Sequence, residues 1–208
     1  MSVEYVIFDA MGVVYPVEDD TNDLLIPFVQ VHNPLITAME ISALYHEASL
    51  GHIKSTEFWS RCNISGISPE DIEYSYLNTC LKPDEAFFPV AEALKKRGLH
   101  LVMLSNDVSE WSFFLRKKWG LDDLFELSII SGDVGIRKPD ADIYRFALEK
   151  LKCNPEACMF IDDRVKNLIP AKELGIQVIH FDREKELESS KRGIQRIMCF
   201  EDLLSISY

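Results

Sequence analysis

The sequence predicts an α/β fold: a doubly wound sheet of about five mostly parallel strands with helices on both faces. Short apolar segments alternate with stretches of helical periodicity, which is typical of β-α-β units. Segments such as LHLVML are continuously apolar, which indicates strands buried on both faces of the sheet. The predicted strands are residues 5–8, 99–104, 127–130, 158–161 and 177–181.

Helices are predicted between the strands from residues that commonly begin or end a helix. Ser109 and Asp140 can cap a first helical turn with their side-chain oxygens. Gly98 and Gly175 can end a helix, because glycine readily adopts the left-handed conformation found there. The predicted helices are residues 90–97, 109–119, 141–152 and 165–174, with a short one near 201–204.

One long region interrupts this alternation. Between about Pro16 and Leu81, the segments TAMEISALYHEASLG and STEFWSRC have helical spacing. Ser68 is followed by a proline and two acidic residues, as at the start of a helix. We therefore expect a helical insert at residues 16–81 and an α/β core made of residues 1–15 and 82–208.

The composition argues against several classes of partner. The chain of 208 residues has 22 lysines and arginines against 34 acidic residues, and its formal charge of −12 repels nucleic acids and anionic membranes. The first residues lack the features of a signal peptide, and no run of 18 apolar residues is present. The five cysteines have no metal-ligand spacing. We expect a cytoplasmic protein that binds neither nucleic acid nor membrane, with its oligomeric state left open.

Polar residues gather where the predicted strands end. In an open parallel sheet, ligands bind beyond the carboxyl ends of the strands. Converging carboxylates repel one another, and a hard cation relieves that repulsion; Mg²⁺ suits oxygen ligands better than zinc does. A lysine and a hydroxyl can hold the oxygens of a phosphoryl group. The set that predicts phosphoryl chemistry comprises Asp9, Ser105, Asn106, Lys138, Asp162 and Asp163.

Four segments carry a family resemblance. In chain order, FDAMGVV, LSND, GDVGIRKPDADIY and FIDDRVKN resemble the four signatures of the haloacid dehalogenase superfamily. This resemblance implies a Rossmann-like core and makes the helical insert similar to the helical cap of that family. It also implies a hydrolase, and most directly a phosphatase that acts on a small phosphorylated metabolite.

The resemblance assigns roles in handling the substrate. Asp9 is implied as the catalytic nucleophile, which forms a covalent aspartyl intermediate. Ser105 and the backbone of Asn106 are implied to hold the transferring group, and Lys138 to steady both that group and the nucleophile.

The resemblance also implies a Mg²⁺ site. Asp9 and Asp163 would bind the ion directly, Asp162 would bind it through water, and Met11 would contribute its backbone carbonyl. Asn167 either orients a metal ligand or points to solvent.

Position 11 departs from the pattern of the family's phosphatases, which have a second aspartate there as general acid and base. A methionine can neither donate nor accept the proton, and such catalysis is typically worth ~10²–10⁴-fold in rate. We therefore expect weak or narrowed phosphatase activity and an aspartyl intermediate that accumulates, unless another side chain substitutes. The candidates near the insert are Glu18, Asp19, Asp20, His46 and His52.

Two other functions remain open. FDAMG also resembles the FDAYG of 2-haloacid dehalogenases, in which Asp9 would displace halide without needing an acid. Those enzymes use no metal, lack paired acids such as Asp162 and Asp163, and bind the substrate carboxylate with a cap arginine, for which Arg61 is the candidate. Alternatively, the protein is a non-catalytic member that keeps the fold for binding or regulation.

Overall fold

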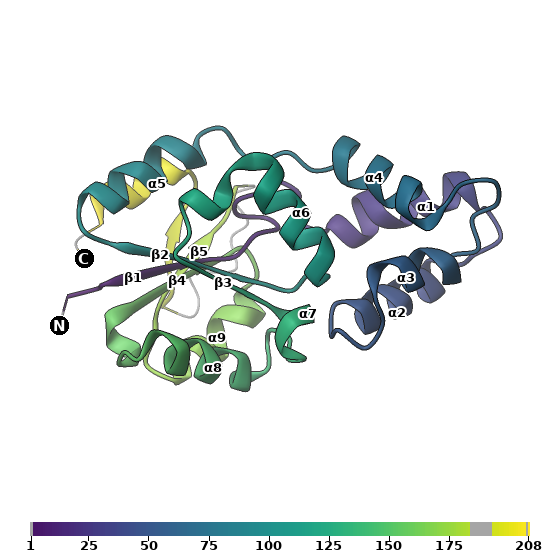
Figure 1. The fold of residues 1–208 in the computed structure, drawn as a ribbon. Helices are drawn as coiled ribbons and strands as arrows, with labels where there is room; N and C mark the ends of the chain where they lie inside the picture. Colours follow the sequence, from purple (N-terminus) through teal and green to yellow (C-terminus); the bar gives the residue numbers. More distant parts are fainter. Residues whose placement is uncertain (1, 184–192, 207) are drawn as a thin grey trace.

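The computed structural model describes residues 2–183, 193–206 and 208, and a six-stranded parallel sheet forms its centre (Figure 1). The strand order is β3-β2-β1-β4-β5-β6. The early strands β2 and β3 therefore lie on one side of β1, and the later strands β4, β5 and β6 lie on its other side. The strands are β1 Tyr5–Phe8, β2 His100–Ser105, β3 Leu127–Ile130, β4 Cys158–Asp162, β5 Gln177–Phe181 and β6 Gln195–Ile197.

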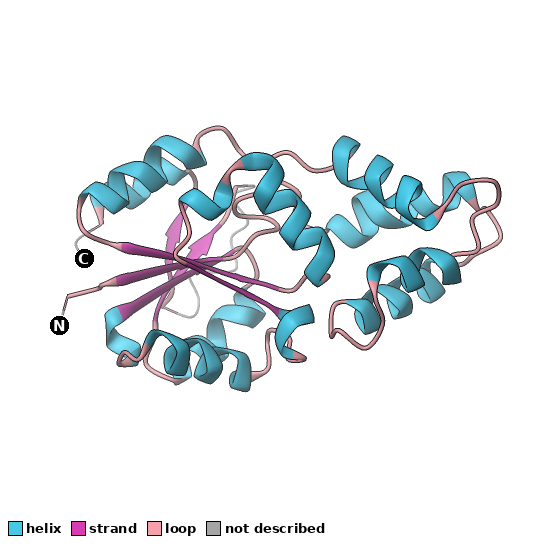
Figure 2. Cartoon of the chain, viewed as in Figure 1, coloured by secondary structure: helices cyan, strands magenta, loops and turns pink. Residues whose placement is uncertain are grey.

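Alternate residues of each strand face opposite layers of the core. In β1, Val6 and Phe8 pack into one hydrophobic cluster with helices on one face of the sheet, whereas Ile7 packs into a second cluster with helices on the other face. All three side chains are buried, and burying each contributes roughly 1.5–3 kcal/mol. Helices therefore cover both faces of the sheet (Figure 2). These helices are α5 Phe87–Lys96, α6 Ser109–Trp119, α8 Ala141–Leu151 and α9 Val165–Glu173, with the short α7 Ser131–Val134 and the 3-10 helices η2 Leu121–Asp123, η3 Pro155–Ala157 and η5 Phe200–Ser205.

A second group of helices lies at one end of the molecule, beyond the sheet (Figure 1). α2 begins at a capping box formed by Thr37 and Glu40, and α4 begins at Ser68, whose hydroxyl accepts from the Asp71 amide. We call this set, together with its connecting loops, the helical group. It consists of η1 Thr21–Leu25, α1 Ile26–His32, α2 Ala38–Ala48, α3 Ser55–Arg61 and α4 Pro69–Thr79.

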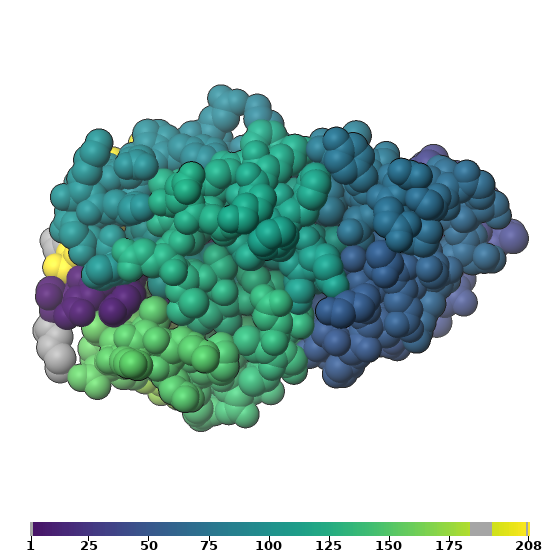
Figure 3. Space-filling model, viewed as in Figure 1, coloured from purple at the N-terminus to yellow at the C-terminus, as the bar shows by residue number. Residues whose placement is uncertain are grey.

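The helical group packs directly against α6 and α7 of the sheet region, and Figure 3 shows the two parts in contact. Trp59 of α3 and Trp111 of α6 both donate their indole N–H to Glu73 of α4, at 3.0 and 2.9 Å. The Ser131 hydroxyl, at the start of α7, donates to the Ser49 carbonyl at 2.6 Å. These buried and half-buried polar contacts fix the helical group above the carboxyl ends of the strands.

The α/β class is confirmed, with two differences in detail. The sheet has six strands rather than the five predicted. The three-residue β6 was missed because it carries no apolar run. Asp140 caps α8 as expected, but Ser109 is the first residue of α6 and makes no cap; Val108 stands at the cap position.

Candidate active site

Three neighbouring strands bring their carboxyl ends together at the centre of the sheet. Asp9 directly follows β1, while Ser105 and Asp162 are the last residues of β2 and β4, the two strands that pair with β1. Between β1 and β4 the direction of strand order reverses, which is where ligands bind in sheets of this type.

Lys138 lies between two buried carboxylates. Its Nζ is 2.7 Å from Oδ1 of Asp9 and 2.8 Å from Oδ2 of Asp162. Burial alone would lower the pKa of Lys138, but the charges of Asp162 and Asp9 raise it above its ordinary value. The ammonium group therefore stays charged and holds both carboxylates in place.

Asp9, Asp162 and Asp163 form a cluster in which one oxygen of each lies within 4.8 Å of the others. Burial, together with the charges of Asp162 and Asp163, raises the pKa of Asp9 well above its ordinary value. Burial likewise raises the pKa of Asp163 to about 7, with Asp162 as the next cause. Burial acts against Asp162 too, but the charge of Lys138 and the hydrogen bonds to Asp9, Lys138 and the Arg164 amide together lower the pKa of Asp162. When ionised, the three carboxylates thus carry more negative charge than Lys138 alone neutralises.

The loop after β1 leaves room for the Asp163 side chain. Gly12 has φ +77°, and a Cβ at this position would lie 2.3 Å from the Asp163 carboxylate. Oδ1 of Asp163 is buried and has no hydrogen-bond partner among the described residues. An unpartnered carboxylate oxygen within a carboxylate cluster fits a hard divalent cation.

Asp162 is held by several donors. The Asn167 side chain of α9 is buried and its Nδ2 lies 3.0 Å from both Asp162 oxygens. The backbone amide of Arg164 donates to Oδ1 at 2.8 Å. These bonds satisfy Asp162 without a metal, in contrast to Asp163.

Asn106 and Ser105 differ in what their side chains contact. The Asn106 side chain exchanges two 2.8 Å hydrogen bonds with the main chain of Lys138 and so fixes the loop that carries the lysine. The Ser105 hydroxyl is buried without a hydrogen-bond partner in the described part of the chain.

A small cavity of about 60 Å³ opens onto Asp9, whereas Ser105, Asp162 and Asp163 do not line it. The expected site residues that line it are Asp9, Met11, Asn106, Lys138 and Asn167. Residues that the sequence did not single out complete its walls: Thr21, Tyr45, Arg137 and Arg164. Arg137 and Arg164 are next to Lys138 and Asp163 in the sequence, so that position could have indicated them. Thr21 and Tyr45 come from the helical group, and no sequence pattern marked them as site residues.

Of the five candidates to replace the missing acid, the structure brings Asp20 to the cavity wall. Asp20 precedes η1 and is buried, and its burial raises the carboxyl pKa to about 6. Asp19 instead accepts hydrogen bonds from Asn22, and His46 and His52 are exposed to solvent.

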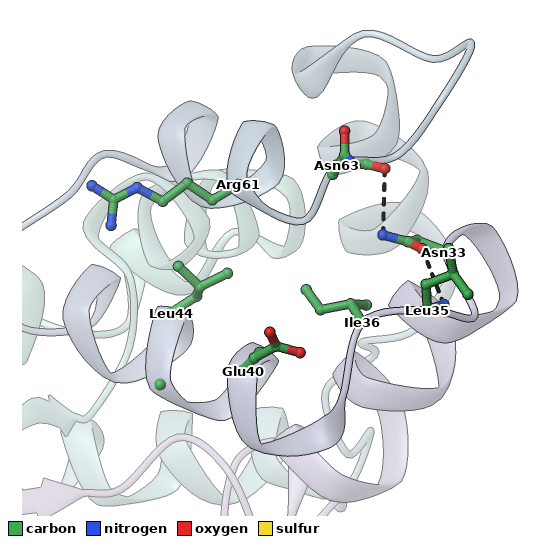
Figure 4. Close-up of a pocket in the computed structure, with 8 residues that line it drawn as sticks. Asn33, Leu35, Ile36, Glu40, Leu44, Arg61 and Asn63 are labelled. Carbon is green, nitrogen blue, oxygen red and sulfur yellow. Dashed lines mark hydrogen bonds between the residues drawn. The ribbon is translucent and has the colours of Figure 1, made fainter.

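A larger cavity of about 480 Å³ lies within the helical group, between α1, α2 and α3 (Figure 4). Arg61 lines this cavity and forms ion pairs with Glu47 and Glu57. It does not line the cavity that contains Asp9, so the expected carboxylate-binding arginine of a dehalogenase is not in that wall.

The chain matches a known protein family over most of its length. The model of the haloacid dehalogenase-like hydrolases matches residues 3–175. The chain therefore belongs to this family of hydrolases. Within the described ranges, no helix combines the length and apolar character needed to cross a membrane.

Curated relatives include phosphatases. The chain is 27% identical over 148 residues to a sesquiterpene phosphatase of Aspergillus oryzae, which covers 63% of this chain and 76% of the relative. It is 37% identical over 101 residues to a phosphoserine phosphatase of Thermus thermophilus, but this covers 46% of the chain and 41% of the relative.

Solved structures share the fold at low identity. A haloacid dehalogenase family enzyme from Bacteroides thetaiotaomicron, in complex with magnesium and inorganic phosphate, has a TM-score of 0.72 and 19% identity, covering 92% of this chain and 100% of that one. An L-2-haloacid dehalogenase has a TM-score of 0.69 and 19% identity, covering 99% and 98% of the two chains. At 19% identity, both similarities show a shared fold.

Proposed function

We propose that this protein is a Mg²⁺-dependent phosphatase for small phosphorylated metabolites that acts through an aspartyl phosphate on Asp9. The observation that carries the proposal is the contact of Lys138 with both Asp9 and Asp162, next to Asp163. A carboxylate steadied by a lysine can attack phosphorus, and neighbouring carboxylates can hold a cation against the phosphate. The phosphatases among the relatives support this reaction class.

The Mg²⁺ ligands in this proposal are Asp9, Asp163 and the main-chain carbonyl of Met11, with Asp162 acting through water. The unpartnered Oδ1 of Asp163 supports a direct bond, and the hydrogen-bonded state of Asp162 supports an indirect one. When bound, the ion would supply the positive charge that reduces repulsion between Asp9 and a phosphate.

The side chains divide the reaction between them. Asp9 attacks phosphorus in line with the leaving group, and the bond to that group breaks as the bond to Asp9 forms. Lys138 holds the attacking carboxylate and the transferring oxygens, and it is itself kept in place by Asp162. The Ser105 hydroxyl and the backbone N–H of Asn106 donate to the phosphoryl oxygens. Water then attacks the aspartyl phosphate and releases inorganic phosphate.

The helical group serves, in this proposal, as a cap that covers the phosphate and selects the substrate. This corresponds to a cap of residues 16–81 on a core of residues 1–15 and 82–208. Tyr45 and Asp20 reach the cavity from the cap side, and the Tyr45 hydroxyl donates to the Asn106 carbonyl at 3.2 Å. Because the cavity is about 60 Å³, the proposal favours narrow activity on small substrates. A cytoplasmic location remains a prediction.

The alternatives are weaker. For dehalogenation of a 2-haloacid, Arg61 is engaged with glutamates elsewhere, and although Arg137 and Arg164 line the cavity, that reaction gives no role to the paired carboxylates of Asp162 and Asp163. A non-catalytic role is favoured by Met11 alone, and it predicts Mg²⁺ binding without turnover.

The proposal is tested by phosphate release from acetyl phosphate and p-nitrophenyl phosphate, with Mg²⁺ and with excess chelator. We expect Mg²⁺-dependent hydrolysis of at least the smaller substrate, abolished in Asp9→Asn. Asp123→Asn is the matched control, because it makes the same chemical change at an exposed residue of η2. Metal binding without hydrolysis of either substrate would support the non-catalytic alternative, and release of halide from a 2-haloacid would support the dehalogenase.

A further inference from the structure

Hydrolysis through an aspartyl phosphate requires two proton transfers. When Asp9 attacks an alkyl phosphate, the departing oxygen leaves readily only if it receives a proton. When water then attacks the aspartyl phosphate, it must lose a proton. Met11 lines the cavity, but its thioether can take part in neither step.

We propose that Asp20 supplies the general acid and general base that position 11 lacks. This inference rests on the proposed phosphatase function. In the first step the Asp20 carboxylic acid gives its proton to the leaving oxygen, which departs as an alcohol while Asp9 becomes phosphorylated. In the second step the Asp20 carboxylate takes a proton from water, whose oxygen bonds to phosphorus as the bond to Asp9 breaks. Asp20 ends protonated, and Asp9 ends as a free carboxylate.

The location of Asp20 carries this proposal. The chain turns back after β1 through hydrogen bonds from Tyr15 to Ala10 and from Gly12 to Val17, and Asp20 then lines the same cavity as Asp9 and Met11. The side chain is buried, with the residue 8% exposed. A cavity of about 60 Å³ holds so little that a small molecule within it contacts several walls at once. A phosphate bound against Asp9 would therefore lie within reach of Asp20.

The charges around Asp20 suit a group that alternates between acid and carboxylate. Burial disfavours the ionised form and raises its pKa to about 6, and neighbouring Asp19 acts in the same direction. Arg164, which precedes α9, and Arg137, which follows α7, oppose this effect. Burial and, after it, the charge of Asp20 raise the pKa of Asp107, which follows β2. A value near neutrality lets one carboxyl group perform both transfers.

Other groups in the cavity wall suit these transfers less well. Burial raises the pKa of Tyr45 well above its ordinary value, and its hydroxyl already donates to the Asn106 carbonyl. Lys138 is held charged between Asp9 and Asp162. The guanidinium groups of Arg137 and Arg164 have no lone pair to accept a proton from water.

The test compares Asp20→Asn with Asp19→Asn on two small substrates. Asp19→Asn makes the same chemical change one residue earlier, at a side chain that bonds Asn22 rather than lining the cavity. Ethyl phosphate has a leaving group that needs a proton, and acetyl phosphate has one that does not. We expect Asp20→Asn to lower kcat on ethyl phosphate by ~10²–10⁴-fold, with Asp19→Asn within about 3-fold of wild type.

Acetyl phosphate separates the two steps. In Asp20→Asn we expect a burst of acetate equal to the concentration of sites, followed by slow turnover as the phosphoenzyme accumulates; wild type should show no burst. Adding Met11→Asp to Asp20→Asn should recover turnover of ethyl phosphate, because it supplies a carboxyl group again. If Asp20→Asn had only damaged the structure, the second substitution would not restore turnover. Equal loss of the first step on both substrates, or no recovery in the double variant, would overturn the proposal.

The outcomes distinguish this proposal from the function on which it rests. If wild type and Asp19→Asn hydrolyse acetyl phosphate and Asp20→Asn does so without a burst and at the same rate, Asp20 is not the acid and base, while the phosphatase function stands. If none of the three hydrolyses either substrate, the phosphatase function itself fails and this inference fails with it.

Discussion

The two sides of the small cavity are built in different ways. The sheet side presents Asp9 and Asn106, which directly follow β1 and β2, and Lys138, whose loop is tied to them by Asn106. The helical side presents Asp20 and Tyr45, which reach the cavity from the segment between β1 and β2. The sheet side thus holds the nucleophile and its lysine in fixed positions, and the helical side brings the proposed acid and base to them from a separate segment of the chain.

This comparison predicts the largest effect for loss of Lys138. In Lys138→Met the buried carboxylates of Asp9 and Asp162 lose their counter-charge, and we expect no detectable phosphatase activity. The free energy of unfolding should fall by about 3–5 kcal/mol at neutral pH. Urea denaturation measures this loss, with Lys150→Met as the exposed control. Stability equal to that of the control would contradict the account of the sheet side.

Gly12→Ala should have the next largest effect. The new Cβ would lie 2.3 Å from the Asp163 carboxylate and would displace it, besides imposing a left-handed φ on alanine. The backbone strain alone costs about 1–2 kcal/mol. Gly98→Ala is the matched control, since it has φ +85° and nothing within 4 Å of the new Cβ.

Thermal unfolding with and without Mg²⁺ separates the two causes in the glycine variants. Both should unfold at lower temperature than wild type, but only Gly12→Ala should lose the stabilisation by Mg²⁺. The same Mg²⁺ response in both variants would show that Asp163 is not a metal ligand.

A moderate effect of pH is expected on the metal-free protein. Because burial raises the folded-state pKa of Asp163 to about 7, the folded state binds a proton that the unfolded state releases near pH 4. The stability contributed by Asp163 is therefore full below pH 4 and is lost as pH rises to about 7. Mg²⁺ replaces that proton, so the increase in unfolding temperature on adding Mg²⁺ should be larger at pH 8 than at pH 5. Asp163→Asn should remove this difference, and an equal response at both pH values in wild type would contradict it.

The smallest effect is expected for loss of the Tyr45 hydroxyl. Tyr45→Phe removes the hydrogen bond to the Asn106 carbonyl, which should lower the free energy of unfolding by about 0.5–1.5 kcal/mol. Tyr74→Phe changes an exposed hydroxyl and is the control. Phosphatase activity should fall less than in Lys138→Met. A loss of phosphatase activity as large as in Lys138→Met would contradict the expected difference between Tyr45 and the sheet side of the cavity.

The sheet side could be predicted because its signals are local. Asp9 and Asp162 each stand where a run of apolar residues ends, and in a parallel sheet such positions share one edge. The fold class followed from the same alternation. β6 could not be predicted, since its three residues pair with β5 without an apolar pattern of their own.

The helical side could not be predicted because its contacts join residues far apart in the chain. Asp20 was one of five equivalent candidates in the sequence, and its place in the wall depends on how the loop after β1 folds back. The contact of Tyr45 with Asn106 spans 61 positions. His46, one residue from Tyr45, points to solvent because its neighbour occupies the inward face of α2.

The central claim is that Asp9 becomes phosphorylated. The most direct measurement is rapid acid quenching of the protein mixed with acetyl phosphate and Mg²⁺, followed by mass analysis of its peptides. The account predicts an added phosphoryl group on the peptide that contains Asp9 in the fraction of molecules quenched between the two steps, a fraction larger in Asp20→Asn than in wild type, and no such group with chelator or in Asp9→Asn. Turnover of acetyl phosphate with a label on another peptide, or undiminished turnover in Asp9→Asn, would contradict it.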